Sequence, residues 1–239
     1  MTDGSFASVG VGATSWTTGR IISKDFPAPH LVRLRMHVDD RQRHWPGQHY
    51  LIRLRAPDDY TAQRSYSLAS DDSDPLVEFL VERLPDGEVS EFLADVAEVG
   101  DVLELRGPIG RWFRWDTYTP ALCLVGGTGL VPAVSMIRAA RRLDRSDLLR
   151  VVAVARSPEE LPYADELARA GATIAYTRDG TGGRPPGPPT ADEIGPLLAG
   201  AELAYVCGSS RFAEFAEGLL IASGVSPEAI RVERFGVTG

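Results

Sequence analysis

The hydrophobic pattern of this 239-residue chain changes near residue 120, and this change constrains the fold more than any other feature. Before it, apolar and charged residues alternate, as in the segments VRLRM at 32–36 and IRLR at 52–55. Alternation with a period of two is typical of strands that bury one face. After it, continuous apolar runs alternate with segments of helical periodicity. The sequence therefore predicts two domains of different class.

The first domain consists of short alternating segments separated by turns rich in Pro, Gly and Asp. The same pattern recurs at 76–81 and 102–105, with a short helical stretch at 89–96 between them. Many short strands joined by tight turns are typical of an antiparallel barrel or sandwich. We therefore expect an antiparallel β-barrel over residues 17–118. A loose Gly/Ser/Thr-rich leader is expected at 1–16.

In the second domain, over residues 119–239, apolar runs suit strands that are covered on both faces. Strands are expected at 121–125, 149–155, 173–177, 203–207 and 230–235. Helices are expected at 130–142, 163–170 and 211–222, and another begins at a capping box from Thr190 to Glu193. Regular alternation of strand and helix is typical of a parallel sheet with nucleotide-type connections. We therefore expect an α/β nucleotide-binding domain.

Composition excludes several classes of protein. The net charge of −8 and the pI near 5.1 argue against a nucleic-acid binder, which usually carries a basic face. No apolar run approaches the roughly 20 residues that a membrane span needs, and no secretory signal is visible at the start. The cysteines are Cys123 and Cys207, without a CxxC, so they predict a reducing compartment and build no iron–sulfur cluster. We expect a cytoplasmic protein without a metal site.

A glycine-rich turn joins the first expected parallel strand to its helix, with the order Gly126-Gly127-Thr128-Gly129 and then Pro132 in the first helical turn. Glycines let the backbone approach a pyrophosphate, and the helix start supplies free N–H groups. Pro132 stands where the dinucleotide fingerprint has its third glycine, and a tight strand–helix turn alone also needs glycine. The location at the carboxyl end of the strand favours phosphate binding. The sequence thus predicts Gly127, Thr128 and Gly129 as contacts of a pyridine nucleotide.

Arginines follow the next two expected strands. Arg156-Ser157 comes at the end of the second strand, where a binder of NADH usually offers an Asp or Glu to the ribose. Arg178 follows the third strand, and Arg184 lies in the glycine-rich loop beyond it. Guanidinium groups bind phosphate well, although each one alone also fits an ordinary solvated side chain. Together, Arg156, Ser157, Arg178 and Arg184 favour the 2′-phosphate of NADPH, with NADH as the open alternative.

Two short motifs in the barrel half offer contacts for a second cofactor. In RSYS at 64–67, Arg64 can hold a phosphate, and Tyr66 lies on the same side of a strand and can stack on a planar heterocycle. Ser67 offers a hydroxyl to a ring nitrogen. In GEVS at 87–90, the free N–H groups of a helix start can bind an anion. By themselves, an edge strand with a surface arginine and a plain helix cap explain the two motifs as well.

Taken together, these segments resemble the ferredoxin–NADP reductase family over about residues 17–236. The order and spacing of six segments carry the resemblance, which is far more specific than any one of them. They are RSYS at 64–67, GEVS at 87–90, GPIG at 107–110, GGTGLVP at 126–132, YVCGSS at 205–210 and ERF at 233–235. The resemblance implies a flavin-binding barrel followed by an α/β domain that binds the pyridine nucleotide.

The resemblance also implies roles for individual residues. The implied FAD contacts are Arg64, Ser65, Tyr66, Ser67, Gly87, Val89, Ser90, Thr128 and Phe235. Among these, Arg64 would contact the FAD phosphates, Tyr66 would stack on the isoalloxazine and Phe235 would cover its other face. Cys207 would lie beside the reactive carbon of the nicotinamide, Gly208 would be a further NADP contact, and Ser67, Cys207 and Glu233 would be the catalytic residues. In many plant-type members the aromatic residue ends the chain, whereas four residues follow Phe235 here.

The function implied by the resemblance is hydride transfer from NADPH to FAD, followed by single-electron transfer to a separate ferredoxin or similar small redox protein. One alternative is a flavin or quinone reductase, or an oxygenase reductase subunit that uses NADH. Another is a non-catalytic subunit that binds nucleotide as a redox sensor. Tyr66, Ser67, Cys207 and Glu233 favour the enzyme, because a sensor need not retain the residues of hydride transfer.

Overall fold

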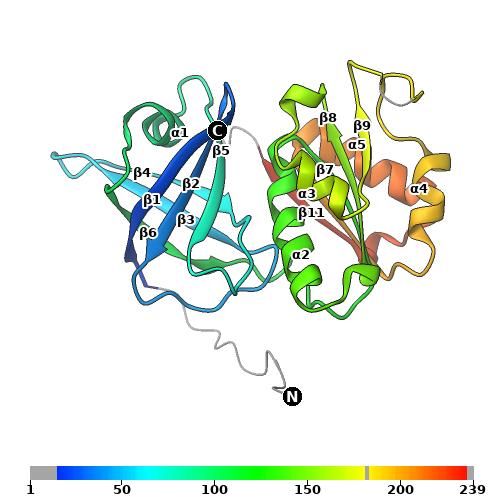
Figure 1. Cartoon of the computed structure of the whole chain (residues 1–239), viewed down its shortest axis with the longest axis horizontal. Coiled ribbons are helices and arrows are strands. Elements are labelled where there is room, and N and C mark those ends of the chain that lie inside the picture. The colour runs from blue at the N-terminus through cyan, green and yellow to red at the C-terminus, as the bar shows by residue number, and fades with distance from the viewer. Residues whose placement is uncertain (1–14, 181–182, 236–239) are drawn as a thin grey trace.

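The computed structural model describes residues 15–180 and 183–235, and these form two domains, each built around one sheet (Figure 1). Most of the leader expected at 1–16 therefore lies outside the described residues. The first sheet contains β1 (Thr17–Ala28), β2 (Leu31–Val38), β3 (His49–Arg55), β4 (Thr61–Ser67), β5 (Val77–Glu82) and β6 (Val102–Ile109). The second contains β7 (Ala121–Gly126), β8 (Leu149–Ala155), β9 (Thr173–Tyr176), β10 (Leu203–Ser209) and β11 (Ile230–Phe235).

The first sheet is antiparallel and has the order β4-β3-β6-β1-β2-β5. A bridge between Leu68 and Phe79 joins the end of β4 to β5, so the two edges of the sheet meet and form a barrel. The expected helix at 89–96 has two parts, a short α1 (Glu88–Glu91) and a π-helical turn, η1 (Phe92–Val96). Val89 and Leu93 from these turns pack into the barrel core. The predicted antiparallel barrel is confirmed.

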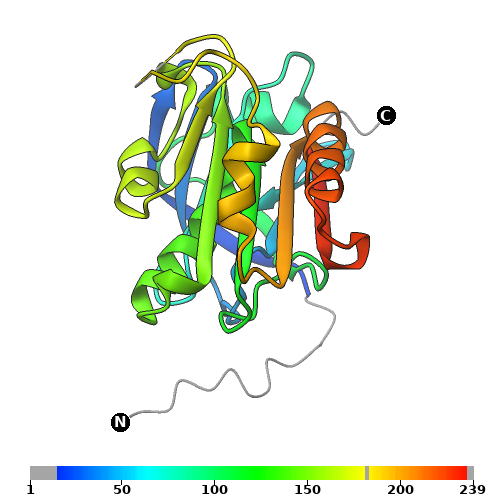
Figure 2. The ribbon, with the colours of Figure 1, turned by 90° about the vertical axis from the view of Figure 1, so that its right-hand side faces the viewer.

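The second sheet is parallel, with the order β11-β10-β7-β8-β9. Helices cover both of its faces (Figure 2), because its strands present apolar side chains on both sides. The helices are α2 (Val131–Arg142), α3 (Ala164–Arg169), α4 (Ala191–Leu198) and α5 (Ser210–Ala222), with short 3₁₀ turns η2 (Gly127–Leu130), η3 (Ser146–Leu148), η4 (Pro158–Glu160) and η5 (Pro227–Ala229). The predicted capping box forms, with the Glu193 N–H donating to Thr190 Oγ1 and the Thr190 N–H donating to Glu193. The predicted α/β domain is confirmed.

The two domains share an apolar contact. Leu31 and Leu80 of the barrel belong to the same buried cluster as Val131 and Val134 of α2. Burying these side chains removes apolar surface of both domains from water, which stabilises their association. Within the described part of the chain, no helix combines the length and apolar character needed to cross a membrane.

Candidate functional site

A cavity of about 1150 Å³ lies between the two domains. On the barrel side it is lined by β4 and by the segment from β5 to α1, and on the other side by the carboxyl ends of β7, β8 and β10. In α/β sheets this is the edge at which ligands bind. The sequence-predicted residues that line it are Arg64, Ser65, Tyr66, Ser67, Gly87, Val89, Ser90, Gly127, Thr128, Arg156 and Phe235. The fold thus brings residues from distant parts of the chain to one cavity, which is large enough for a dinucleotide.

The end of β4 forms one wall of this cavity. Ser67 is 5% exposed, and its Oγ has no hydrogen-bond partner among the described residues. A buried hydroxyl without a partner is unfavourable, so this atom suits a ligand that supplies a donor or acceptor. Tyr66, the preceding residue of β4, also lines the cavity, and burial raises the pKa of its hydroxyl. This wall therefore contributes both an aromatic ring and an unsatisfied polar atom to the cavity, a combination that suits the ring system of a flavin.

Arg64 lies two residues before Tyr66 and is exposed to the cavity. Within the described chain, the one hydrogen bond of its guanidinium runs from Nη1 to the Gln63 carbonyl, at 2.8 Å. The other guanidinium N–H groups are open to a ligand, and a guanidinium pairs well with a phosphate. Arg64 and Tyr66 thus place a cation and an aromatic ring two residues apart on one strand. This arrangement suits the phosphates and the ring system of FAD.

The turn into α1 lines the cavity mainly through its backbone. A Cβ at Gly87 would collide with Ser90 Oγ, so the turn requires glycine at this position. Ser90 Oγ accepts from the Leu84 N–H at 3.2 Å and donates to the Gly87 carbonyl at 3.1 Å. Val89 is buried in the barrel core. The Ser90 hydroxyl therefore stabilises the turn, which leaves backbone N–H groups as the candidate contacts for an anion.

The glycine turn after β7 forms the opposite wall. Thr128 Oγ1 donates to Glu82 Oε2 at 3.3 Å, and this contact joins the two domains across the cavity. Gly129 lies directly on β10, where a Cβ would collide with the carbonyl of Cys207. Glycine at 129 is therefore a packing requirement, and it brings the backbone of the turn against the strand end where a nucleotide would lie.

Cys207 and Glu233 lie in the strands behind this wall. The two residues are register partners in β10 and β11, and the Cys207 side chain is fully buried. Burial and the neighbouring Glu233 raise the pKa of the Cys207 thiol, and burial raises the pKa of Glu233 to about 7. Of the described residues of these two strands, Ser209 and Phe235 line the cavity, whereas Cys207, Gly208 and Glu233 are not among its lining residues. The structure therefore does not bring the predicted catalytic residues Cys207 and Glu233 into the cavity with Ser67.

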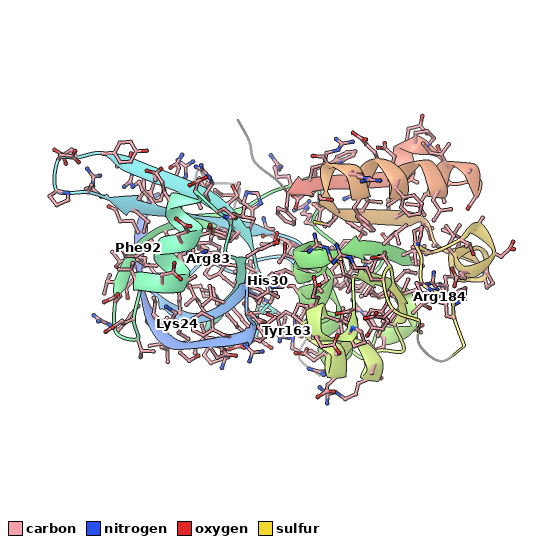
Figure 3. All side chains as sticks on the ribbon, turned by 90° about the horizontal axis from the view of Figure 1, so that it is seen from above. Lys24, His30, Arg83, Phe92, Tyr163 and Arg184 are labelled. Carbon is pink, nitrogen blue, oxygen red and sulfur yellow. The ribbon has the colours of Figure 1, made fainter. Side chains whose placement is uncertain are left out.

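The four residues predicted to bind a 2′-phosphate separate into two groups. Arg156 lines the main cavity, and Ser157 lines an adjoining hollow of about 530 Å³. The backbone N–H of Arg178 donates to the Arg156 carbonyl at 3.0 Å, so these two arginines are neighbours. Arg184 instead pairs with Glu193 through Nε and Nη2, at 2.6 and 3.1 Å, on the side of the α/β domain away from the barrel (Figure 3). The structure thus pairs Arg184 with Glu193 and does not group it with the other three residues.

The cavity also contains residues that sequence reasoning missed: His30, Glu82, Asp86, Ser209, Arg211 and Phe212. Arg211 follows the YVCGSS motif directly, so this motif was a signal for it. His30 and Glu82 are brought together because Leu31 pairs with Glu82 between β2 and β5. Only the strand pairing reveals these two residues.

The raised pKa of the buried Glu233 carboxyl predicts how the stability of the protein depends on pH. Its folded-state pKa of about 7 exceeds its ordinary value of 4.5, so the folded protein holds this proton more tightly than the unfolded chain. The stability that this proton contributes is complete below pH 4.5 and is lost as the pH rises through 7. Between pH 5 and pH 8, we expect Glu233→Gln to remove about 1–3 kcal/mol of the pH-dependent change in the free energy of unfolding.

The measurement is the free energy of unfolding by denaturant between pH 5 and pH 8, for the wild type and Glu233→Gln. Glu214→Gln, which alters an exposed carboxylate on α5, is the control and should follow the wild-type curve. Identical pH slopes for the wild type and Glu233→Gln would contradict the raised pKa.

Comparison with known proteins places this geometry in a family. The model of the oxidoreductase FAD-binding domain matches residues 19–114. The ferredoxin–NAD(P)⁺ reductase component of the naphthalene 1,2-dioxygenase/salicylate 5-hydroxylase systems of Ralstonia sp. is 30% identical in a 234-residue alignment that covers 92% of this chain and 69% of that protein. The reductase component of propane 2-monooxygenase from Mycolicibacterium smegmatis is 30% identical over 206 residues, 80% of this chain and 58% of that protein.

Solved structures share the two-domain fold. The flavohem-like FAD/NAD-binding domain of nitric oxide dioxygenase from Vibrio cholerae superposes with a TM-score of 0.81 at 22% identity, covering 92% of this chain and 99% of that one. A ferredoxin NADP⁺ reductase from Neisseria gonorrhoeae, with bound FAD and NADP, superposes with a TM-score of 0.78 at 19% identity, covering 92% and 98%. With this fold, the FAD-binding domain match and 30% identity to a reductase component along most of its length, the chain belongs to the ferredoxin–NAD(P) reductase family of oxidoreductases.

Proposed function

We propose that the protein takes electrons from NADPH or NADH onto FAD and passes them singly to a ferredoxin-type acceptor. The observation that carries this proposal is the single cavity in which Ser67, Tyr66 and Arg64 of the barrel face the glycine turn of the α/β domain. FAD, when bound, supplies the two-electron to one-electron conversion, which is its own chemistry. The protein must therefore hold two ring systems in contact and exclude water from them.

Each wall of the cavity has a separate part in this task. Arg64 binds the FAD phosphates, Tyr66 supports one face of the ring system, and the Ser67 hydroxyl forms a hydrogen bond to a ring nitrogen. The backbone of Gly127 to Gly129 holds the pyrophosphate of the pyridine nucleotide. Phe235, at the end of β11, lines the cavity and covers the other ring face. Transfer requires the reacting atoms of the two rings to come within about 3–3.5 Å.

The proposed acceptor is an iron–sulfur protein of the ferredoxin type. Relatives are named as reductase or electron transfer components of dioxygenase and monooxygenase systems, which supports a place in such an electron-transfer chain. The chain's two cysteines, Cys123 and Cys207, are both fully buried and cannot bind a cluster that needs four ligands. Reduction of cytochrome c in the presence and absence of added ferredoxin tests this step. Dependence on ferredoxin supports the proposal, and equal rates with and without it would contradict it.

The choice of donor depends on the charges around Arg156. Arg156 and its neighbour Arg178 favour the 2′-phosphate of NADPH, the donor that the sequence predicts. Arg156 also lies 3.4 Å from Glu160, and Glu82 and Glu159 line the same hollow, which favours the ribose hydroxyls of NADH. We therefore propose that the balance of Arg156 against these carboxylates sets the preference.

Two substitutions should move the donor preference in opposite directions. Arg156→Ala is expected to lower kcat/KM for NADPH about tenfold relative to NADH, because a charge-assisted hydrogen bond to phosphate is lost. Glu160→Gln is expected to raise the NADPH to NADH ratio, because it frees Arg156 and removes a repulsive charge. Steady-state kinetics with both donors measures the ratio. An unchanged ratio in both variants would place donor selection elsewhere.

Anaerobic titration tests the proposed function as a whole. Purified protein loaded with FAD should lose its flavin absorbance within seconds of adding a stoichiometric amount of NADPH or NADH. An excess of oxidised ferredoxin, which accepts one electron per molecule, should then restore that absorbance. A redox sensor would bind the nucleotide without this loss. Failure to bind FAD, or bound FAD that neither donor reduces, would contradict the proposal.

Ser67→Ala should have opposite effects on function and stability, because the proposed hydrogen bond to the flavin and the unsatisfied buried hydroxyl are removed together. We expect flavin reduction to slow about tenfold or more, because one hydrogen bond to the reacting ring is lost. We expect the free energy of unfolding of the FAD-free protein to stay constant or rise by about 1 kcal/mol, because an unsatisfied buried polar atom is removed. Stopped-flow reduction and denaturant unfolding measure the two effects. Thr61→Ala, at an exposed position of the same strand, is the control.

A further inference from the structure

One face of α2 is hydrogen-bonded to the barrel along the loop that follows β4. Ser135, Arg138 and Arg142 are three and four residues apart, so they share this face of the helix. Their partners are three consecutive residues of the loop. The contacts are Arg138 Nη1 to the Ala69 carbonyl (3.1 Å), Ser135 Oγ to the Ser70 carbonyl (2.8 Å) and Arg142 Nε to Asp71 Oδ2 (2.6 Å).

A buried carboxylate of the barrel lies at the centre of these contacts. The Glu78 side chain is 7% exposed, and it accepts from Arg138 Nη1 at 3.2 Å and from the Tyr163 hydroxyl at 2.8 Å. Glu166 of α3 binds Arg138 through Nε and Nη2, at 2.9 and 2.7 Å. Because Glu166 occupies that edge of the planar guanidinium, Nη1 is directed to the barrel. Figure 3 shows Tyr163 at the boundary between the two domains.

On the barrel side, the loop after β4 is itself fixed. His44 is fully buried and its Nε2 lies 3.0 Å from the Ser70 carbonyl, which also accepts from α2. Burial lowers the pKa of His44 to about 4, so the imidazole stays neutral at ordinary pH. Further along the loop, Asp74 forms an ion pair with Arg35 of β2 at 2.7 Å. Because these contacts fix the loop to the barrel, any movement of α2 relative to the loop also moves α2 relative to the whole barrel.

We propose that these contacts form an interdomain latch that positions the two walls of the cavity relative to each other and thereby sets the distance between the two rings. The latch comprises Ala69, Ser70, Asp71 and Glu78 of the barrel, and Ser135, Arg138, Arg142, Tyr163 and Glu166 of the α/β domain. This inference rests on the proposed function, because the walls matter for transfer only if both rings bind there.

The chain connects the latch closely to both walls. Ala69 is two residues after Ser67, so their Cα atoms are at most about 7 Å apart. Ser135 is four residues after Val131, where α2 begins directly behind the glycine turn, a rise of about 6 Å. The latch thus lies within about 7 Å of Ser67 along the chain on one side and about 6 Å from the start of α2 on the other. The shared apolar contact opposes separation of the domains, but the directional hydrogen bonds of a guanidinium also oppose sliding.

Transfer is sensitive to such sliding, because a misplacement of about 1 Å can slow a reaction about 100-fold. The test is the limiting rate of anaerobic flavin reduction at saturating donor in Glu78→Gln and Arg138→Met. The matched control is Arg53→Met, which breaks an Arg–Glu pair of 2.6 Å within the barrel, between Arg53 and Glu104. We expect a loss of at least tenfold in both latch variants, with FAD content and KM for the donor within twofold of wild type. The control should reduce at the wild-type rate.

Hydrogen exchange at segments 68–72 and 127–135 supplies a readout that does not need the donor. Both segments should exchange faster in the latch variants than in the wild type and the control. Wild-type reduction rates or unchanged exchange in the latch variants would overturn the latch. If neither donor reduces the wild-type flavin, the proposed function fails, and exchange still decides whether the latch holds the walls. Should Arg138→Met fail to fold, the isosteric Glu78→Gln decides the outcome.

Discussion

Replacement of Arg64 by alanine is expected to raise the dissociation constant for FAD about 100-fold, so that the variant is purified largely without flavin. Arg64 lies at the cavity with most of its guanidinium N–H groups open to a ligand within the described structure. Hydrogen bonds between a guanidinium and a phosphate contribute about 1.5–3 kcal/mol, which corresponds to a change of 10- to 150-fold in affinity. Because Arg64 is exposed, its loss should leave the fold intact.

Flavin fluorescence titration of the FAD-free protein measures the dissociation constant for Arg64→Ala and the wild type. Arg55→Ala is the control, because Arg55 is an exposed arginine of the neighbouring strand β3 that pairs with Asp59 and does not line the cavity. We expect the control to bind FAD like the wild type. Equal affinities of Arg64→Ala and the control would show that the FAD phosphates lie elsewhere.

Gly129→Ala is expected to disrupt the cavity wall that the glycine turn after β7 forms, and to destabilise the α/β domain. A Cβ at 129 collides with the Cys207 carbonyl, and backbone atoms cannot rotate away as a flexible side chain does. Forcing the glycine turn off β10 costs about 2 kcal/mol, as overpacking in a core typically does. For a chain of this size, such a loss lowers Tm by about 4–8 °C. Because the turn also forms the wall of the cavity, reduction by NADPH and NADH should fall by tenfold or more.

Gly218→Ala is the matched control for this substitution. Gly218 lies within α5, and a Cβ there meets no other atom within 4 Å. Alanine is the better helix former, so the control should gain up to about 1 kcal/mol. Thermal unfolding and flavin reduction are measured on both variants. A Gly129→Ala variant that matches the wild type in both measurements would contradict the close approach of the turn to β10.

The sequence predicts those features of the fold and the site that depend on local pattern. The change of periodicity near residue 120 is enough to predict an antiparallel sheet followed by a parallel one, because each sheet type imposes its own pattern on its own strands. RSYS at 64–67 and the glycine turn at 126–129 combine residue type with a place at a strand end, and both line the cavity.

Features that depend on contacts between distant segments could not be predicted in this way. Glu82 enters the cavity because β5 pairs with β2, and no local signal marks it. Arg184 lies on the chain beyond β9 like a phosphate ligand, but its guanidinium pairs with Glu193 at the start of α4, a contact that no local sequence signal marks. Cys207 occupies a strand buried on both faces, where apolar periodicity does not show which face its side chain meets.

We propose that one cavity between the two domains holds the flavin and the pyridine nucleotide in contact. A crystal structure of the protein with FAD and the oxidised nucleotide tests it most directly. We expect an isoalloxazine against Tyr66 with a ring nitrogen at hydrogen-bond distance from Ser67 Oγ, and a nucleotide whose pyrophosphate lies on the turn from Gly127 to Gly129. FAD bound outside this cavity, or a nucleotide on a different edge of the α/β sheet, would show that the two cofactors do not meet here.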